Sequence, residues 1–247
     1  MNNVEALDRE FGLVSDLVRL TARDLPDRPA FILDGVRQSY GETVKLMDRV
    51  AAALQRDGVK QREAIACCAS TSIEYATLFL GALSIGVVMS PLAPSSTPEQ
   101  LAGMVADCGA RLLFLDATTA ESLKGAGDAN TVRISLDGSD CGKPFGKWLA
   151  PEGAAVTPAK IEPGDPFNII YSSGTTGIPK GIVQSHRMRW AHVQRANAFQ
   201  YDRTALTLLS TPLYSNTTLV SFFPTLAGGG TIALMKKFDA RKFLELA

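Results

Sequence analysis

The stretch YATLFLGALSIGVVMSPLAPSSTP, residues 75–98, contains no charged side chain and is long enough to resemble a membrane-spanning helix. Gly86 and two prolines interrupt it, and the β-branched pair Val87-Val88 replaces helix-compatible residues in its middle. We therefore predict a buried helix followed by a buried strand, without stable insertion in a membrane.

The same order recurs in a second uncharged stretch, residues 204–235. There TTLVSFFPTLA is followed by the glycines 228–230 and then by the apolar run TIALM. Short β-branched runs without polar alternation indicate strands that are covered on both faces, as in a parallel sheet flanked by helices. The predicted fold class is therefore α/β, with layered and largely parallel sheets flanked by helices.

Three further segments fit this scheme. Residues 42–56 place their apolar side chains on one helical face, whereas 111–116 (RLLFLD) and 132–137 (VRISLD) are typical of strands. Gly, Pro and Lys are frequent between residues 138 and 164, a composition typical of a boundary. We place the division after residue 165, so that 1–165 form a first α/β subdomain and 166–247 begin a second.

The chain ends with FDARKFLELA, residues 238–247, which has a helical pattern but no Gly, Asn or Pro to stop it. We interpret this ending as a truncation.

Composition limits the kind of ligand. The chain has 25 basic and 25 acidic residues, so no net charge favours a nucleic acid or an acidic lipid. The four cysteines form no C-x-x-C pair, and there are two histidines, so we predict no metal ligands. The first residues resemble no signal peptide, and we expect a cytoplasmic protein with a small-molecule site.

The segment NIIYSSGTTGIPKGIVQSH, residues 168–186, has the features of a phosphate-binding loop between two strands. Its glycines let successive N–H groups converge on an anion, its hydroxyls add donors, and its lysine adds a positive charge. The predicted binding residues are Ser172, Ser173, Gly174, Thr175, Thr176, Gly177 and Lys180.

Three other interpretations of this segment are disfavoured. Pro179 precedes Lys180 and Gly181 follows it, which excludes the G-x-x-x-x-G-K-[ST] loop of nucleotide hydrolases. No G-x-G precedes the glycines, which excludes the dinucleotide fingerprint. A flexible linker would not need an apolar strand on each side.

The run S-S-G-T-T-G-x-P-K-G resembles the signature phosphate loop of the adenylate-forming superfamily, which comprises acyl-CoA synthetases, peptide-synthetase adenylation domains and luciferases. Residues 39–42 (SYGE) resemble its early Y-x-E element, and 81–94 its buried helix and strand. The resemblance implies that a small-molecule carboxylate reacts with ATP and Mg²⁺ to give an acyl-adenylate, and that coenzyme A then displaces AMP. It also implies that the predicted loop residues hold the β- and γ-phosphates.

The segment TPLYSNT, residues 211–217, matches the family's next element, P-L-[FY]-H, whose histidine borders the acyl site. Here Ser215 stands in place of that histidine, and Asn216 follows it. We predict an acyl pocket at Tyr214, Ser215 and Asn216, whose polarity would suit a short or hydroxylated acyl group. In the alternative, Ser215 and Asn216 cap a helix that begins near Thr217.

His186 and His192 lie six residues apart in a predicted helix and therefore on different faces, which excludes a metal pair. We interpret His186 as a satisfied polar residue near the helix start, although it matches a frequent family position. Arg187, Arg189 and Arg195 are predicted to form a solvated face, with a contact to the phosphates of coenzyme A as the alternative.

In the family, the adenine platform, the Thr-Glu pair that assists Mg²⁺, the ribose-binding Asp and the C-terminal domain with its catalytic lysine lie downstream. We therefore assign no catalytic residue and predict that the fragment alone is inactive. The predicted function is the N-terminal part of an AMP-forming carboxylate–CoA ligase in fatty acid metabolism. A stand-alone phosphate- or nucleotide-binding module and an adenylation domain that serves a carrier protein are the alternatives.

Overall fold

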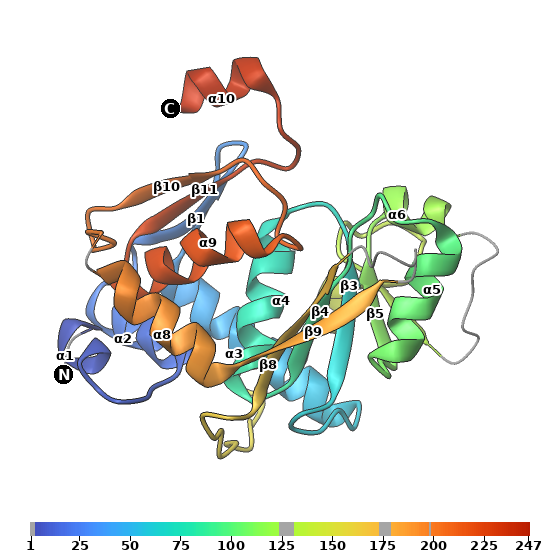
Figure 1. The fold of residues 1–247 in the computed structure, drawn as a ribbon, viewed down its shortest axis with the longest axis horizontal. Coiled ribbons are helices and arrows are strands. Elements are labelled where there is room, and N and C mark those ends of the chain that lie inside the picture. The colour runs from blue at the N-terminus through green and yellow to red at the C-terminus, as the bar shows by residue number, and fades with distance from the viewer. Residues whose placement is uncertain (1–2, 124–130, 173–178, 198) are drawn as a thin grey trace.

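The computed structural model describes residues 3–123, 131–172, 179–197 and 199–247, and it consists of two sheets with helices between them (Figure 1). The helices are α1 (Asn3–Leu7), α2 (Val14–Asp24), α3 (Tyr40–Arg56), α4 (Ile73–Ser84), α5 (Pro98–Asp107), α6 (Ala117–Ser122), α7 (Phe145–Trp148), α8 (His186–Asn197), α9 (Asn216–Gly228) and α10 (Ala240–Leu246).

The smaller sheet has the strand order β10-β11-β1-β2 and the larger one the order β7-β6-β5-β3-β4-β8-β9. Their bounds are β1 (Pro29–Leu33), β2 (Val36–Ser39), β3 (Ala64–Cys68), β4 (Val88–Pro91), β5 (Leu112–Leu115), β6 (Val132–Ser135), β7 (Lys143–Pro144), β8 (Pro166–Ser172), β9 (Lys180–Ser185), β10 (Leu206–Leu209) and β11 (Thr231–Leu234). All pairs are parallel except β1 with β2 and β8 with β9. The predicted fold class is confirmed.

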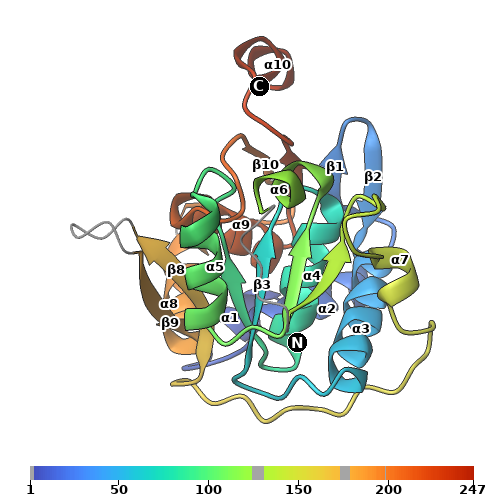
Figure 2. The same cartoon turned by 90° about the vertical axis from the view of Figure 1, so that its right-hand side faces the viewer.

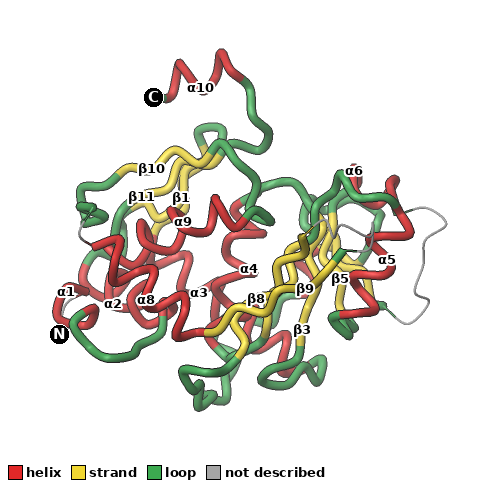
Figure 3. The backbone as a smooth tube through the Cα atoms, in the orientation of Figure 1, coloured by secondary structure: helices red, strands yellow, loops and turns green. Residues whose placement is uncertain are grey.

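The helices α2, α3, α4, α8 and α9 fill the space between the sheets (Figure 3), and α5 and α6 cover the outer face of the larger sheet (Figure 2). Alternate residues of β3 consequently enter two different cores: Cys67 faces the inner helices, whereas Ala66 and Cys68 pack with Leu101 of α5. Burial on both faces explains why the central strands lack polar alternation.

The uncharged stretch at residues 75–98 divides as predicted, because α4 is a buried helix and β4 a strand with no exposed residue. None of the helices within the described residues has the length and the apolar character that crossing a membrane requires.

The SYGE element begins α3 and joins it to the far end of the chain. Ser39 and Glu42 form a capping box, in which each side chain accepts a hydrogen bond from the backbone N–H of the other. The fully buried Tyr40 donates its hydroxyl proton to the carbonyl oxygen of Gly230 at 2.7 Å. This contact fixes the start of α3 against the turn between α9 and β11.

Both sheets combine strands from the two sides of residue 165, since β1 pairs with β11 and β4 with β8. The division of the chain at that point stays a prediction. The predicted terminal helix is present as α10, which extends from the body of the molecule (Figure 1) and contains no buried residue.

The packing of α3 on α4 depends on Gly81, because a Cβ atom there would lie 2.7 Å from Val50 Cβ and 2.9 Å from the Met47 carbonyl oxygen. We predict that Gly81→Ala lowers the free energy of unfolding by about 1–3 kcal/mol, since the crowded contact includes backbone. Urea denaturation of both proteins measures this difference.

Gly103→Ala in α5 is the matched control, because nothing lies within 4 Å of its added methyl group. That change should stabilise the helix by about 0.5–1 kcal/mol. Equal effects at the two glycines would contradict the packing argument.

Candidate functional site

The predicted phosphate loop connects two antiparallel strands, β8 and β9. Ser172, the last residue of β8, lies opposite Lys180, the first residue of β9, and both side chains are exposed. The predicted strands on the two sides of the loop are confirmed. The predicted binding residues Ser173, Gly174, Thr175, Thr176 and Gly177 lie outside the described residues.

Tyr171 anchors the end of this hairpin to α5. Its hydroxyl donates to Asp107 Oδ2 at 2.6 Å and lies 3.1 Å from the carbonyl oxygen of Met104. Burial and the bond to Asp107 raise the pKa of Tyr171, so the phenol stays protonated. The end of β8 that precedes the loop is therefore attached to α5.

Gly181, which follows the loop lysine, has a steric role. A Cβ atom at this position would lie 3.0 Å from Ile169 Cγ2 and 3.2 Å from Tyr171 Cε1. The absence of a side chain at Gly181 thus leaves room for the Tyr171 ring to lie against β9 while its hydroxyl reaches Asp107 of α5.

A buried polar cluster lies where Asn168 pairs with Gln184, four residues along the hairpin from the Ser172–Lys180 pair. Arg189 of α8 is 1% exposed and donates from Nε to Asn168 Oδ1 at 3.3 Å and from Nη2 to Asn216 Oδ1 at 2.8 Å. It also donates to Gln184 Oε1. We call Arg189, Asn168, Gln184 and Asn216 the Arg189 cluster.

The prediction of a solvated arginine face was wrong for Arg189, whereas Arg187 and Arg195 are exposed as predicted. The reason is helical periodicity, because His186, Arg189 and Val193 recur at the spacing of one buried face. The charge of Arg189 suggested that it is exposed to solvent, but its position on the helix places it on the buried face.

Arg189 stays charged in its buried environment, but its hydrogen-bond partners among the described residues carry no negative charge. Burial lowers the pKa of Arg189 to about 10, which still leaves the side chain protonated at neutral pH. The Cζ atom lies 5.8 Å from the ring centres of Phe167 and Phe223, a distance at which cation–π attraction operates. Its Nη1 atom is buried and has no acceptor among the described residues.

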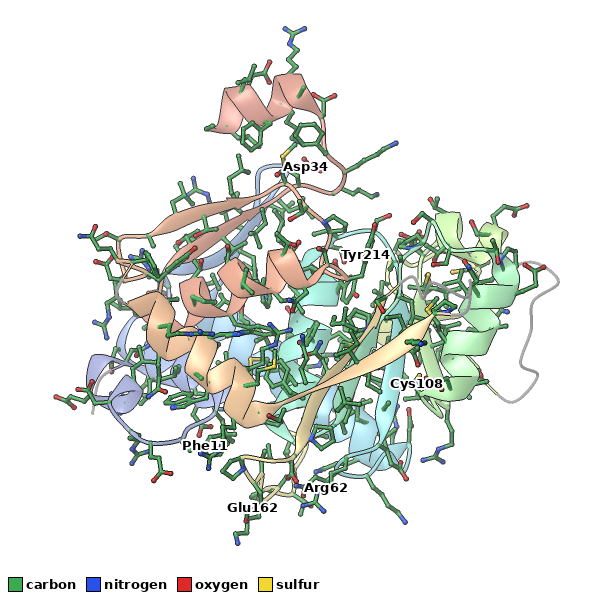
Figure 4. The ribbon with its side chains drawn as sticks, in the orientation of Figure 1. Phe11, Asp34, Arg62, Cys108, Glu162 and Tyr214 are labelled. Carbon is green, nitrogen blue, oxygen red and sulfur yellow. The ribbon has the colours of Figure 1, made fainter. Side chains whose placement is uncertain are left out.

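The TPLYSNT segment leads into α9, and its tyrosine, Tyr214, is labelled in Figure 4. Ser215 occupies the N-cap position, but its side chain makes no capping hydrogen bond. Asn216 Oδ1 accepts from Arg189 and, at 3.2 Å, from Gln184 Nε2. Helix capping therefore does not explain why Ser215 and Asn216 occupy these positions. All three residues of the predicted acyl pocket are half-buried.

His186 is the first residue of α8 and is 5% exposed. Its ring meets Phe167 edge-on with the ring centres 5.0 Å apart. Burial lowers the pKa of His186 to about 4, although Asp165 acts in the opposite direction. The interpretation as a satisfied polar residue was wrong in part, since Nε2 has no hydrogen-bond partner in the described part of the chain.

Within the described residues, no three His, Cys, Asp or Glu side chains are placed to hold a metal ion. The side chains at the described ends of the loop, a hydroxyl and an ammonium, suit an anion instead. Sequence reasoning missed Asn168, Gln184 and the contact between Tyr171 and Asp107, because each depends on which strands and helices become neighbours.

Comparison with known proteins gives consistent results. The family model described as AMP-binding enzyme matches residues 18–247. The 4-coumarate–CoA ligase 3 of Oryza sativa subsp. japonica is 31% identical over 222 residues, which cover 86% of this chain and 40% of that protein. The phosphinothricin tripeptide synthetase PhsB of Streptomyces viridochromogenes is 30% identical over 226 residues, 89% of this chain and 18% of that protein.

Among solved structures, the N-terminal domain of FACL13 from Mycobacterium tuberculosis has a TM-score of 0.83 at 21% identity. The match covers 96% of this chain and 60% of that one, and it shows a shared fold. The chain therefore spans about two fifths of the length of the 4-coumarate–CoA ligase and 60% of the length of this neighbour.

The buried His186 predicts a pH dependence of stability. Its pKa is about 4 in the folded chain and 6.5 when unfolded, so the unfolded state binds the proton first as the pH falls. The contribution of His186 to the free energy of unfolding is therefore complete above pH 6.5 and is lost progressively as the pH falls toward 4. We predict that about 2 kcal/mol of the unfolding free energy is lost between pH 7.5 and pH 5 through this residue.

Urea denaturation at both pH values, with wild type and His186→Gln, measures the loss. His192→Gln is the comparison, because burial also lowers the pKa of the half-buried His192, but by less than that of His186, so its loss should remove a smaller part of the pH dependence. Retention of the full pH dependence in His186→Gln would refute the assignment.

Proposed function

Because the chain belongs to the AMP-binding enzyme family, we propose that it forms the N-terminal part of an AMP-forming carboxylate–CoA ligase. The observation that carries the proposal is the hairpin end, where Ser172 and Lys180 lie opposite each other at the two sides of an S-S-G-T-T-G-x-P-K-G loop. The 31% identity to a 4-coumarate–CoA ligase supports coenzyme A as the acceptor.

The proposed reaction begins with attack of a carboxylate oxygen on the α-phosphorus of ATP, which forms an acyl-adenylate and releases pyrophosphate. Two anions must approach each other, so fixed donors and a cation are needed around the phosphates. Lys180 would contribute positive charge to the departing β- and γ-phosphates, and the hydroxyl of Ser172 would donate a hydrogen bond. The exposed position of both side chains fits this task.

Magnesium would enter with ATP and offset part of the phosphate charge. The loop residues Ser173, Gly174, Thr175, Thr176 and Gly177 are proposed as further phosphate donors on the grounds of their sequence. In the second step the thiol of coenzyme A would displace AMP and form the thioester.

We propose that the acyl group lies at Tyr214, Ser215 and Asn216. These residues are half-buried and precede or begin α9, and Asn216 also contacts the Arg189 cluster. A pocket with fixed polar groups would favour substrates that can form hydrogen bonds.

A carrier protein is the alternative acceptor, and the similarity to PhsB, a tripeptide synthetase, favours it. The two acceptors are distinguished by supplying the acyl-adenylate with either coenzyme A or a phosphopantetheinylated carrier protein. Thioester formation with the carrier alone would replace the proposed acceptor while leaving adenylation intact.

We predict that Lys180→Ala in the complete ligase lowers carboxylate-dependent pyrophosphate release by about 10²–10³-fold, because a cation on the leaving group is lost. Lys147→Ala is the control, since Lys147 is also exposed but lies in α7, away from the hairpin. Unchanged release in Lys180→Ala would refute the role of the loop. Nucleotide binding by a wild type that never forms acyl-adenylate would favour a stand-alone binding module.

We predict that residues 1–247 alone release pyrophosphate at less than about 1% of the rate of the complete ligase, since catalysis of this kind depends on groups that surround both reactants. A panel of carboxylates with ATP, assayed at equal protein concentration, measures the ratio. Comparable rates would show that the chain contains a sufficient active site.

A further inference from the structure

The Arg189 cluster contains a buried cation whose described partners are all neutral. The guanidinium donates to the amide oxygens of Asn168, Gln184 and Asn216. Burial lowers its pKa, and no carboxylate in the described part of the chain raises it again. A buried charge is ordinarily paired with an opposite charge, because its removal from water is unfavourable.

Two donors of the cluster are also unused. Arg189 Nη1 and Asn168 Nδ2 are buried and have no acceptor among the described residues. Asn168 is fully buried, and its oxygen is already held by the guanidinium. What the cluster lacks is therefore an acceptor with negative charge, and a carboxylate suits the planar fork of an arginine in both respects.

The cluster is continuous with the proposed acyl site. Asn216 is the third residue of that site, and its Oδ1 accepts from Arg189 at 2.8 Å. Asn216 is half-buried, whereas the other three members of the cluster are buried, so it is the member that lies nearest to solvent.

The position along the hairpin separates this anion site from the phosphate loop. The Asn168–Gln184 pair lies four residues from the Ser172–Lys180 pair, a separation of about 13 Å at the rise of a β-strand. An anion on Arg189 is therefore a different group from the β- and γ-phosphates at the loop.

We propose that Arg189 binds a second carboxylate on the acyl substrate, so that the ligase prefers dicarboxylates to monocarboxylates. The proposal rests on the proposed function, whose substrate class it names. Asn168, Gln184 and Asn216 hold the guanidinium in position, and the distal carboxylate supplies the missing negative charge.

The test compares dicarboxylates with monocarboxylates of equal chain length: glutarate with pentanoate, adipate with hexanoate, and suberate with octanoate. In the complete ligase, kcat/KM for pyrophosphate release should favour at least one dicarboxylate by roughly tenfold or more, and Arg189→Met should abolish that preference. Arg187→Met, an exposed arginine on the same helix, should leave the preference unchanged.

Asn216→Asp is the second variant, and it tests the charge argument without removing the arginine. It places a carboxylate where Asn216 Oδ1 now accepts from Arg189, so the cation gains an internal partner. The dicarboxylate preference should fall by a similar factor while the melting temperature rises. Asn216→Asp therefore provides an independent test if Arg189→Met does not fold.

Calorimetric titration with the preferred dicarboxylate separates the two proposals. Binding that depends on Arg189 without any pyrophosphate release would support the anion site and refute the ligase function. Pyrophosphate release with the same substrate ratio in wild type, Arg189→Met and Asn216→Asp would overturn the anion site and leave the ligase function standing.

Discussion

The register between β8 and β9 is the constraint on which the candidate site depends. Six pairs from Pro166–Ser185 to Ser172–Lys180 fix which residues of the two strands face each other. A shift by one residue would turn Asn168, Tyr171 and Gln184 to the opposite face of the sheet. The buried polar cluster and the anchor on α5 would then be lost together.

The register is itself held from both faces of the sheet. On the outer face, Tyr171 binds Asp107, and Gly181 leaves room for its ring. On the inner face, Phe167 packs against His186 and Phe223, with ring centres 5.0 Å apart in each pair. Because β8 also pairs with β4, the hairpin is joined to the larger sheet, and β9 forms the exposed edge of that sheet.

The sequence was most informative where a residue pattern has a local physical cause. Burial on both faces produced the uncharged runs that predicted α4, β4, α9 and β11, and the apolar strands on both sides of the loop predicted the hairpin. The Arg189 cluster could not be predicted in this way, because its members come from β8, β9, α8 and α9. The spacing of His186, Arg189 and Val193 did contain a signal for burial, which the charge of the arginine obscured.

The fold tolerates a buried cation because several weak interactions act on it together. Two aromatic rings face the guanidinium, and three amide oxygens accept from it, so its hydrogen bonds replace part of its lost hydration. A hydrocarbon side chain of similar size would fill this space without needing these partners. Three polar side chains from three separate elements surround Arg189. This arrangement is explained more simply by a cation that is held in position for a ligand, as proposed above, than by packing alone.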